Sequence, residues 1–212
     1  MRDHPTLART AFTVGRDAGG PVESIVGRRH AWRFRLHFHA GDEIVRVLAG
    51  RARLRLPDGC RAVAAGDTLM VPAGVVHRFE PLDGQGWAFV SRFMPASRTA
   101  ACETATLATR AAALLAQRLS LRTDIAAVAR SCAVSEGHLS RAFRRETGSS
   151  LHNFHVLLAL HWAKALLRRR TPVAEAALAA GFYDQSHLNR EFVRTYGMTP
   201  AAFRDGWIVN RL

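Results

Sequence analysis

The chain has 212 residues, 48% of them hydrophobic, which is enough for one large or two small domains with a buried core. No run of 18 apolar residues occurs, and the first residues lack the apolar segment of a signal peptide, so we expect no membrane span and a cytoplasmic location. The net charge of +13 favours a polyanionic partner, although 15 basic against 9 acidic residues up to residue 100 (+6) and 15 against 8 after it (+7) single out neither half.

Residues 21–93 contain short alternating runs that are typical of β-strands, separated by turn signals such as P-D-G at 57–59. The predicted strands are residues 22–26, 32–39, 43–48 and 51–56. In the last of these, three arginines occupy one face and apolar residues occupy the other. Many short, closely spaced strands indicate a small β-barrel or jelly roll.

The composition changes after Pro95. Residues 96–104 are small and polar, which indicates a linker, and from Leu107 onward alanine and leucine dominate a helical pattern. We therefore predict an α+β chain of two domains. Residues 1–95 are expected to form the β-fold and residues 107–212 an all-α fold, joined by a linker at 96–106.

The helical half contains an internal repeat. Residues 137–154 align with residues 186–203 at an offset of 49, and 7 of the 18 aligned positions are identical. Each copy is predicted to form a helix, a short turn and a second helix. A single pattern of this kind is also typical of a plain helical bundle, whereas its duplication favours tandem helix-turn-helix units.

The helix boundaries of the first copy follow from its capping residues. Asp124 is the predicted cap of a helix at 125–131, and Ser135 is the predicted cap of a helix at 136–146 that ends at Gly148. In the second copy, the predicted helices are 173–180 and, after the cap Asp184, 185–195. One long helix at 150–170 joins the copies and spans roughly 28 Å, which is close to one turn of DNA at about 34 Å.

The second helix of each copy has an apolar face and a polar face. The apolar positions lie four residues apart and are Leu139 and Phe143 in one copy, Leu188 and Phe192 in the other. Arginine reads guanine through two hydrogen bonds, and other polar side chains contact bases or phosphates. The predicted DNA-contacting residues are His138, Ser140, Arg141, Arg144, Arg145, Gln185, Ser186, His187, Asn189, Arg190 and Arg194.

Residues 107–205 resemble the tandem helix-turn-helix domain of the AraC/XylS family of bacterial transcription regulators. The first unit, residues 124–148, matches well, and residues 174–204 are close to the family's signature. The resemblance implies binding to promoter DNA and, usually, activation through RNA polymerase. By position it also assigns Gly137 to the recognition surface, but bulkier residues are often seen there, so we expect no side-chain contact from this glycine.

The stretch H-F-H-A-G-D-E at 37–43, followed by Gly50, resembles the first motif of the cupin family. Residues 66–77 resemble the second motif through its histidine, and Pro81 replaces the usual closing asparagine. The resemblance implies a cupin β-barrel over roughly residues 20–95. In such a barrel, four side chains would converge on one interior point: His37, His39, Glu43 and His77.

Three imidazoles and a carboxylate suit Zn(II), Fe(II), Mn(II) or Ni(II), with coordination positions left open. The same cavity is equally compatible with an organic effector that the histidines bind without metal, and with a barrel that holds no ligand. No cofactor is therefore fixed by the sequence.

The leading hypothesis is a one-component transcription regulator without catalytic residues, in which the β-fold senses a small molecule or metal and the helical half binds DNA. The alternative is a metal-dependent cupin enzyme, such as a dioxygenase or isomerase, and the duplicated arginine-bearing units argue against it. A third hypothesis is architectural DNA binding without sequence preference. A homodimer through the barrel or the helix near 107–119 is compatible with the sequence.

Overall fold

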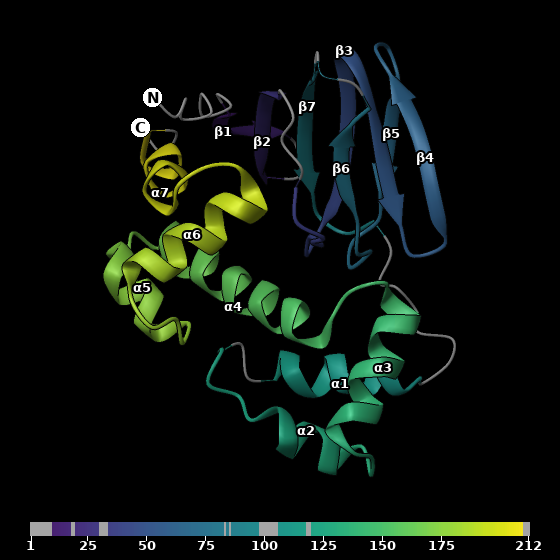
Figure 1. The fold of residues 1–212 in the computed structure, drawn as a ribbon. Helices are drawn as coiled ribbons and strands as arrows, with labels where there is room; N and C mark the ends of the chain where they lie inside the picture. The colour runs from purple at the N-terminus through teal and green to yellow at the C-terminus, as the bar shows by residue number, and fades with distance from the viewer. Residues whose placement is uncertain are drawn as a thin grey trace, which may run out of the picture.

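The computed structural model describes residues 10–17, 20–29, 34–82, 84, 86–97, 106–117 and 120–209. Residues 10–97 are rich in strands and are called the β-domain below, and residues 106–209 are helical and are called the helical domain (Figure 1). The predicted α+β class, with strands first and helices after them, is confirmed. Within the described residues, no helix is both long and apolar enough to cross a membrane.

The β-domain is one sheet of seven strands that curls around its longest member. The strands are β1 (Thr10–Asp17), β2 (Gly20–Arg29), β3 (Asp42–Leu56), β4 (Gly59–Ala64), β5 (Thr68–Val71), β6 (Arg78–Pro81) and β7 (Trp87–Met94). Their order is β1-β2-β7-β3-β4, and β5 and β6 also pair with β3. The first half of β3 lies between β7 and β5, and its second half lies between β4 and β6. One strand therefore serves both walls of the barrel.

The sequence predicted two strands at 43–48 and 51–56, and this was wrong, because both belong to β3. The A-G pair between them is an irregularity, where the pairing with β7 shifts register between Val47 and Ala49. Gly50 has a positive φ of 72°, and a Cβ there would overlap the carbonyl oxygen of Gly86. The glycine therefore bends a continuous strand instead of ending it.

The predicted strand at 32–39 is also wrong over its described part, residues 34–39, which we call the junction segment. The segment makes one isolated bridge, in which the backbones of His37 and His77 exchange two hydrogen bonds of 2.8 Å. The backbone N–H of Arg35 instead donates to the carbonyl of Arg194 in the helical domain, over 3.3 Å. Hydrogen-bonding partners outside the sheet thus replace the strand ladder.

The helical domain begins as the sequence predicts. Its helices are α1 (Leu107–Ala116), α2 (Ile125–Ser131), α3 (Glu136–Thr147), α4 (Leu151–Arg168), α5 (Val173–Ala179), α6 (Gln185–Tyr196) and α7 (Pro200–Val209). The side chains of Asp124, Ser135 and Asp184 accept hydrogen bonds from the first turns of α2, α3 and α6, as expected of N-caps. Gly148 ends α3 with a left-handed φ of 70°.

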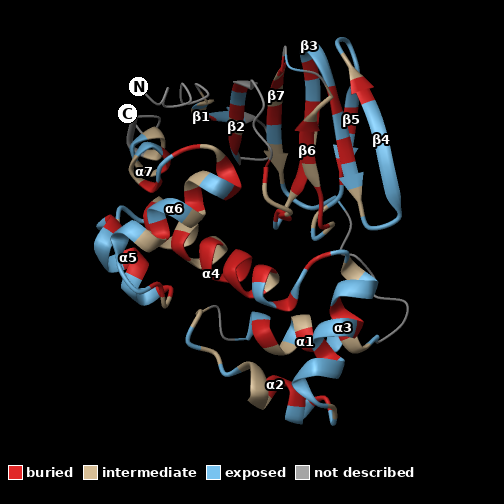
Figure 2. Cartoon of the chain, viewed as in Figure 1, coloured by how far each residue is buried: buried red, intermediate tan, exposed pale blue. Residues whose placement is uncertain are grey.

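Helix α4 forms the centre of the molecule. Most of its residues are buried, and it runs beside the lower end of the sheet with the other helices around it (Figure 2). Its 18 residues span about 27 Å. Strand β1, which the sequence did not predict, contacts α7 of the helical domain. The ring centroids of Phe12 in β1 and Phe203 in α7 are 4.7 Å apart. The predicted linker lies largely outside the described residues.

Candidate functional site

The two helices predicted to contact DNA, α3 and α6, are fixed by matching apolar faces. Leu139 and Phe143 of α3 are 0% exposed, and so are Leu188 and Phe192 of α6. Side chains four residues apart lie on one face of a helix, so burial of this pair turns the arginine-bearing face outward in both helices. The predicted inward and outward faces are therefore as the sequence analysis expected.

Almost all side chains of the predicted DNA-contacting set are exposed. The exposed members are His138, Ser140, Arg141, Arg144, Arg145, Gln185, Ser186, Asn189, Arg190 and Arg194. His187 differs, because it is partly buried, its ring contacts that of Phe182 edge-on at 5.2 Å, and its Nδ1 accepts a 3.4 Å hydrogen bond from the N–H of Tyr183. Gly137 leaves room beside Arg141, whose Nη1 would lie 3.4 Å from a Cβ at that position.

The four predicted ligand residues converge inside the β-domain. Each offers one ligand atom, and these atoms all lie within 4.8 Å of one another. His37 and His39 come from the junction segment, Glu43 comes from β3 and His77 directly precedes β6. All four are buried, with between 0% and 7% of their surface exposed. Ligand atoms about 2.0–2.2 Å from one ion lie at most about 4.4 Å apart, so a spread of no more than 4.8 Å is close to what one ion requires.

Hydrogen bonds to the backbone fix which nitrogen of two imidazoles carries the proton. Nδ1 of His37 donates to the carbonyl of Arg35 over 2.7 Å, and Nδ1 of His77 donates to the carbonyl of Val75 over 2.9 Å. In a neutral imidazole this leaves the lone pair on Nε2, which is then oriented as a metal ligand. Nε2 of His77 lies 2.9 Å from Oε2 of Glu43. Two atoms that both accept hydrogen bonds need a proton or a cation between them.

Burial and charge determine the ionisation of the cluster. Burial lowers the pKa of His37 well below 6.5, and the charges of His77 and His39 lower it further. Burial also lowers the pKa of His39, although the nearby carboxylate of Glu43 acts in the opposite direction. Burial alone would raise the pKa of Glu43, but the charges and hydrogen bonds of His39 and His77 hold it well below 4.5. A buried carboxylate thus lies beside the neutral imidazoles of His37 and His39.

A space of about 20 Å³ remains in the barrel beside this cluster, and Thr195 and Tyr196 of α6 form part of its wall. Two polar atoms of its lining residues are buried and have no hydrogen-bond partner among the described residues: Oγ1 of Thr195 and the hydroxyl of Tyr196. Nε2 of His39 lies 3.4 Å from Oε2 of Glu43. Buried polar groups without partners are rare in proteins. About 10–15 Å³ suffices for one water-sized occupant, so this space fits an ion or a water and not an organic effector.

The junction segment also attaches the ligand-bearing part of the barrel to α4. Nδ2 of Asn153 donates to the carbonyl of Leu36 over 2.9 Å, and Nε2 of His161 donates to the carbonyl of Phe38 over 3.0 Å. The ring of Phe38 lies 4.6 Å from that of His161, edge to face. The residues that alternate with the two histidine ligands therefore contact the helical domain.

A second contact joins the junction segment to α6. The guanidinium of Arg35 forms an ion pair with the carboxylate of Glu191, and both side chains are largely buried. Glu191 also lies 3.4 Å from Nη1 of Arg194. Because the carbonyl of Arg35 accepts from His37, one residue links a candidate ligand to a helix predicted to contact DNA.

A third contact between the domains centres on Glu23 of β2. Its carboxylate accepts hydrogen bonds from Nζ of Lys164 (3.1 Å), from the Arg168 guanidinium (2.7 Å) and from Nε1 of Trp207 (3.0 Å). Burial alone would raise the pKa of Glu23, but the charges of Lys164 and Arg168 and their hydrogen bonds lower it to about 2. A carboxylate of the β-domain is thus held by basic residues of α4.

Comparison with models of known protein families shows to which family this chain belongs. A family model described as an AraC-like ligand binding domain matches residues 20–154, which is more than half of the chain. The chain belongs to the AraC family. A second model, described as a helix-turn-helix domain, matches residues 128–206 and covers the repeat. The resemblance on which the sequence analysis relied is confirmed by both.

Curated relatives of this AraC-family chain are transcription regulators. The arabinose operon regulatory protein of Escherichia coli is 36% identical over 84 residues, which are 39% of this chain and 29% of the relative. The transcriptional activator RhaR of Yersinia pestis is 32% identical over 95 residues, 44% of this chain and 33% of the relative. These matches span about a third of the relatives' length. ToxT of Vibrio cholerae has a similar fold, with a TM-score of 0.58 and 8% identity over 87% of this chain and 98% of that one.

The sequence analysis missed the residues that join the two halves of this AraC-family site. Glu23 and Arg35 lie in no motif, and Glu191 and Tyr196 lie in the second helix-turn-helix unit but were not singled out there. Their contact partners are far away along the chain: Arg35 and Glu191 are 156 positions apart. An acidic residue within the apolar run at 22–26 and the single lysine of the helical half were the local signals.

Proposed function

We propose that this AraC-family chain is a sequence-specific DNA-binding transcription regulator whose β-domain binds a divalent metal ion as its effector. Domain boundaries at 1–95 and 107–212, with a linker at 96–106, belong to this proposal. The observation that carries the metal assignment is the convergence of one ligand atom each from His37, His39, Glu43 and His77, all four buried, within 4.8 Å of one another. The DNA assignment rests on the exposed arginine faces of α3 and α6.

Promoter DNA is the proposed partner of α3 and α6. Arg141 and Arg190 occupy the same position in the two copies, and both are exposed. A rigid helix of about 27 Å separates the copies, which suits two successive major grooves about 34 Å apart. Arg145 and Arg194 also coincide in the repeat and lie one turn further along each helix. These residues supply base and phosphate contacts in the proposal.

His37, His39, Glu43 and His77 are the proposed metal ligands. Three nitrogen donors and one carboxylate suit Zn(II), Fe(II), Mn(II) or Ni(II). When bound, the ion would supply positive charge to the buried carboxylate of Glu43 and would hold the junction segment against β3. The chain's own residues then transmit the effect: Arg35, Leu36 and Phe38 attach the junction segment to α6 and α4.

The size of the barrel space supports a metal over the two other occupants considered from the sequence. The space of about 20 Å³ beside the cluster does not accommodate a sugar or an aromatic effector, and an empty barrel would leave Oγ1 of Thr195 and the hydroxyl of Tyr196 without partners. The enzyme alternative is opposed by the two exposed arginine-bearing faces of α3 and α6, which a catalyst does not need. We therefore propose a sensor and not a catalyst.

RNA polymerase and a second copy of the chain are the further proposed partners. Activation of transcription through RNA polymerase rests on the family relationship. Dimerisation through the β-domain or α1 would place four recognition helices on one DNA site. Size-exclusion chromatography with light scattering, with and without DNA, measures the number of copies directly.

DNA footprinting on the region upstream of the neighbouring gene tests the regulator assignment. A protected segment covering two successive major grooves is expected. Arg141→Ala and Arg190→Ala should each weaken specific binding by about 1–3 kcal/mol. Arg110→Ala, an exposed change on α1 that removes the same charge, is the matched control and should have little effect. Equal affinities of all three variants would contradict the assignment of α3 and α6.

A further inference from the structure

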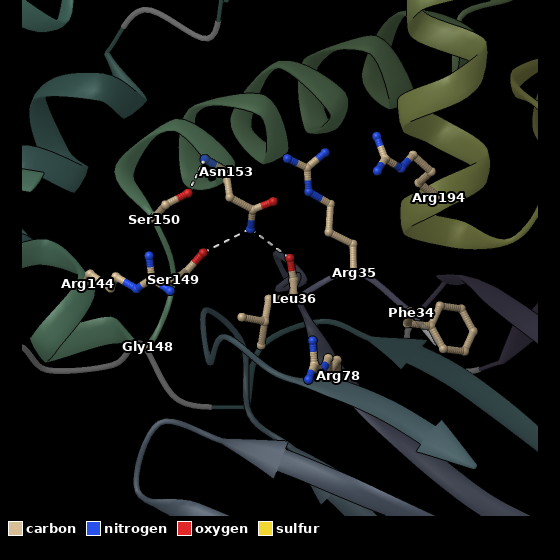
Figure 3. A pocket seen from close by; sticks show the side chains of 10 residues that line it. All are labelled: Phe34, Arg35, Leu36, Arg78, Arg144, Gly148, Ser149, Ser150, Asn153 and Arg194. Carbon is tan, nitrogen blue, oxygen red and sulfur yellow. Dashed lines mark hydrogen bonds between the residues drawn. The ribbon is translucent and has the colours of Figure 1, made fainter. Parts of the chain in front are cut away.

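A second cavity, of about 500 Å³, lies between the β-domain and the helical domain, outside the barrel (Figure 3). Four arginines line it. Arg35 and Arg78 come from the β-domain, and Arg144 and Arg194 come from the last turns of α3 and α6. Two domains thus contribute equal numbers of guanidinium groups to one concave surface.

The positive charge of this cavity exceeds its negative charge. Glu191 is shared by Arg35 and Arg194. Arg78 lies 3.3 Å from Glu80, whose other carboxylate oxygen lies 3.8 Å from an arginine outside the cavity. Arg144 is exposed and forms no ion pair with another residue of the described part of the chain. The described residues that line the cavity include four arginines and no acidic residue, which favours an anionic ligand.

The N-terminus of α4 opens into the same cavity. Ser150 is its N-cap, and Ser149 and Asn153 lie beside it. Free N–H groups at the start of a helix attract anions, and α4 is long enough, at 18 residues, for this effect. The helix end adds to the arginine cluster and does not stand alone.

Asn153 supplies an independent indication that a ligand is bound here. Its Nδ2 donates to the carbonyl of Leu36 and to Oγ of Ser149, both over 2.9 Å, which fixes the orientation of the amide. Its Oδ1 is buried without a hydrogen-bond partner in the described residues, and the residue is 7% exposed. Figure 3 shows this oxygen pointing away from Leu36 and Ser149, toward the side of Arg35. This acceptor is free to take a hydrogen bond from a donor that enters the cavity.

We propose that this cavity binds a small oxyanion that also carries an O–H group, such as a hydroxycarboxylate or a phosphate monoester whose alcohol part has a free hydroxyl. The guanidinium groups and the start of α4 receive the anionic oxygens, and Oδ1 of Asn153 accepts the hydroxyl. The phosphodiester backbone of DNA has anionic oxygens but no such donor, so it does not satisfy Asn153. This site is separate from the barrel and from its four candidate metal ligands.

A bound anion changes the affinity for DNA, an inference that rests on the proposed function. Arg144 and Arg194 belong to the predicted DNA-contacting set, and the anion draws both toward Arg35 and Arg78 of the β-domain. It neutralises charge that DNA would otherwise meet and ties the two recognition helices to the sensor. The anion therefore weakens DNA binding.

Calorimetric titration of the full chain with inorganic phosphate, glycerol 3-phosphate and citrate, at an ionic strength held constant with sodium chloride, tests the site. At least one probe should bind saturably with one site per chain. Arg78→Gln should weaken that binding at least tenfold, as should the exposed change Arg144→Gln. The matched control is Arg53→Gln, which removes the same charge beside the same Glu80 but outside the cavity, and should change the affinity less than twofold. The proposal is overturned if no probe saturates or if the control loses as much affinity as Arg78→Gln.

DNA binding, measured in buffer without these anions, distinguishes a site for a small anion from a site for a backbone phosphate of DNA. Arg78→Gln should bind DNA as the unaltered protein does, and the best probe should raise the dissociation constant for DNA at least threefold in the unaltered protein only. If Arg78→Gln itself weakens DNA binding more than Arg53→Gln does, the cavity holds a DNA phosphate, and the small-anion assignment is wrong. A chain that binds a probe but no DNA would refute the proposed function alone.

Discussion

Arg35 and Glu191 form an ion pair that joins the ligand-bearing junction segment to α6, one residue after Arg190 of the predicted DNA surface. The side chain of Arg35 is 25% exposed and that of Glu191 is 12% exposed, so solvent screens the ion pair only in part. The carbonyl of the same Arg35 accepts the proton of Nδ1 of His37. Any displacement of His37 is thereby passed to α6 through a single residue.

This relationship predicts coupling between Arg35 and Glu191. In a double-mutant cycle with Arg35→Ala and Glu191→Ala, the free energies of unfolding should be non-additive by about 1–2 kcal/mol, because each single change leaves the other charge partly buried without its partner. Chemical denaturation at neutral pH measures the four values. Additive changes would mean that the pair does not hold the domains together.

The candidate metal cluster predicts one divalent ion per chain. Elemental analysis of the purified protein should find it, and His37→Ala or His77→Ala should remove it, whereas His152→Ala, which alters an exposed histidine of α4, should retain it. Because binding to the folded state stabilises it, free metal at about 100 times its dissociation constant should add about 2.7 kcal/mol to the unfolding free energy. Stability that is the same with and without chelator would contradict the assignment.

The contact between Glu23 and α4 predicts a pH-dependent stability. The pKa of Glu23 falls from 4.5 to about 2 in the folded chain, so its contribution is complete above about pH 4.5 and is lost as the pH falls through about 2. Glu23→Gln should reduce the unfolding free energy at pH 7 by about 3 kcal/mol and flatten its decline between pH 4.5 and 2. Glu175→Gln, an exposed change on α5, is the control and should leave both unaltered. A parallel decline in the unaltered protein and Glu23→Gln would refute the role given to this carboxylate.

The hydroxyl of Tyr196 predicts an effect that depends on metal. Its buried oxygen has no hydrogen-bond partner in the described residues. Tyr196→Phe should therefore be neutral or stabilising by up to about 1 kcal/mol in chelated protein, because the change removes an unsatisfied polar group. In metal-loaded protein the same change should be less favourable if the hydroxyl serves the bound ion or its water. Thermal denaturation in both states measures the difference, and strong destabilisation of the chelated protein would show that the hydroxyl has a structural partner.

Local features were predictable from the sequence because local chemistry determines them. The caps Asp124, Ser135 and Asp184 and the stop at Gly148 act within a few residues, and the structure has them where expected. The four metal-ligand candidates could be brought together only through the family resemblance, since 34 residues separate Glu43 from His77.

The junction segment shows why the rest could not be predicted. Its alternation, which is typical of a strand, places His37 and His39 in the barrel, but the residues that alternate with them, Leu36 and Phe38, contact α4. That contact partner lies more than 100 residues away along the chain. Alternation reports that two faces differ in environment, and tertiary packing decides whether the backbone joins a sheet.

The dissociation constant for DNA, measured at one salt concentration with metal-loaded and with chelated protein, tests the central claim most directly. Coupling between two sites typically changes affinity by 5–150-fold, so the account predicts at least a fivefold difference for the unaltered protein. The difference should disappear in His77→Ala and shrink in Arg35→Ala. Equal dissociation constants with and without metal, in a protein shown to bind both metal and DNA, would contradict the account.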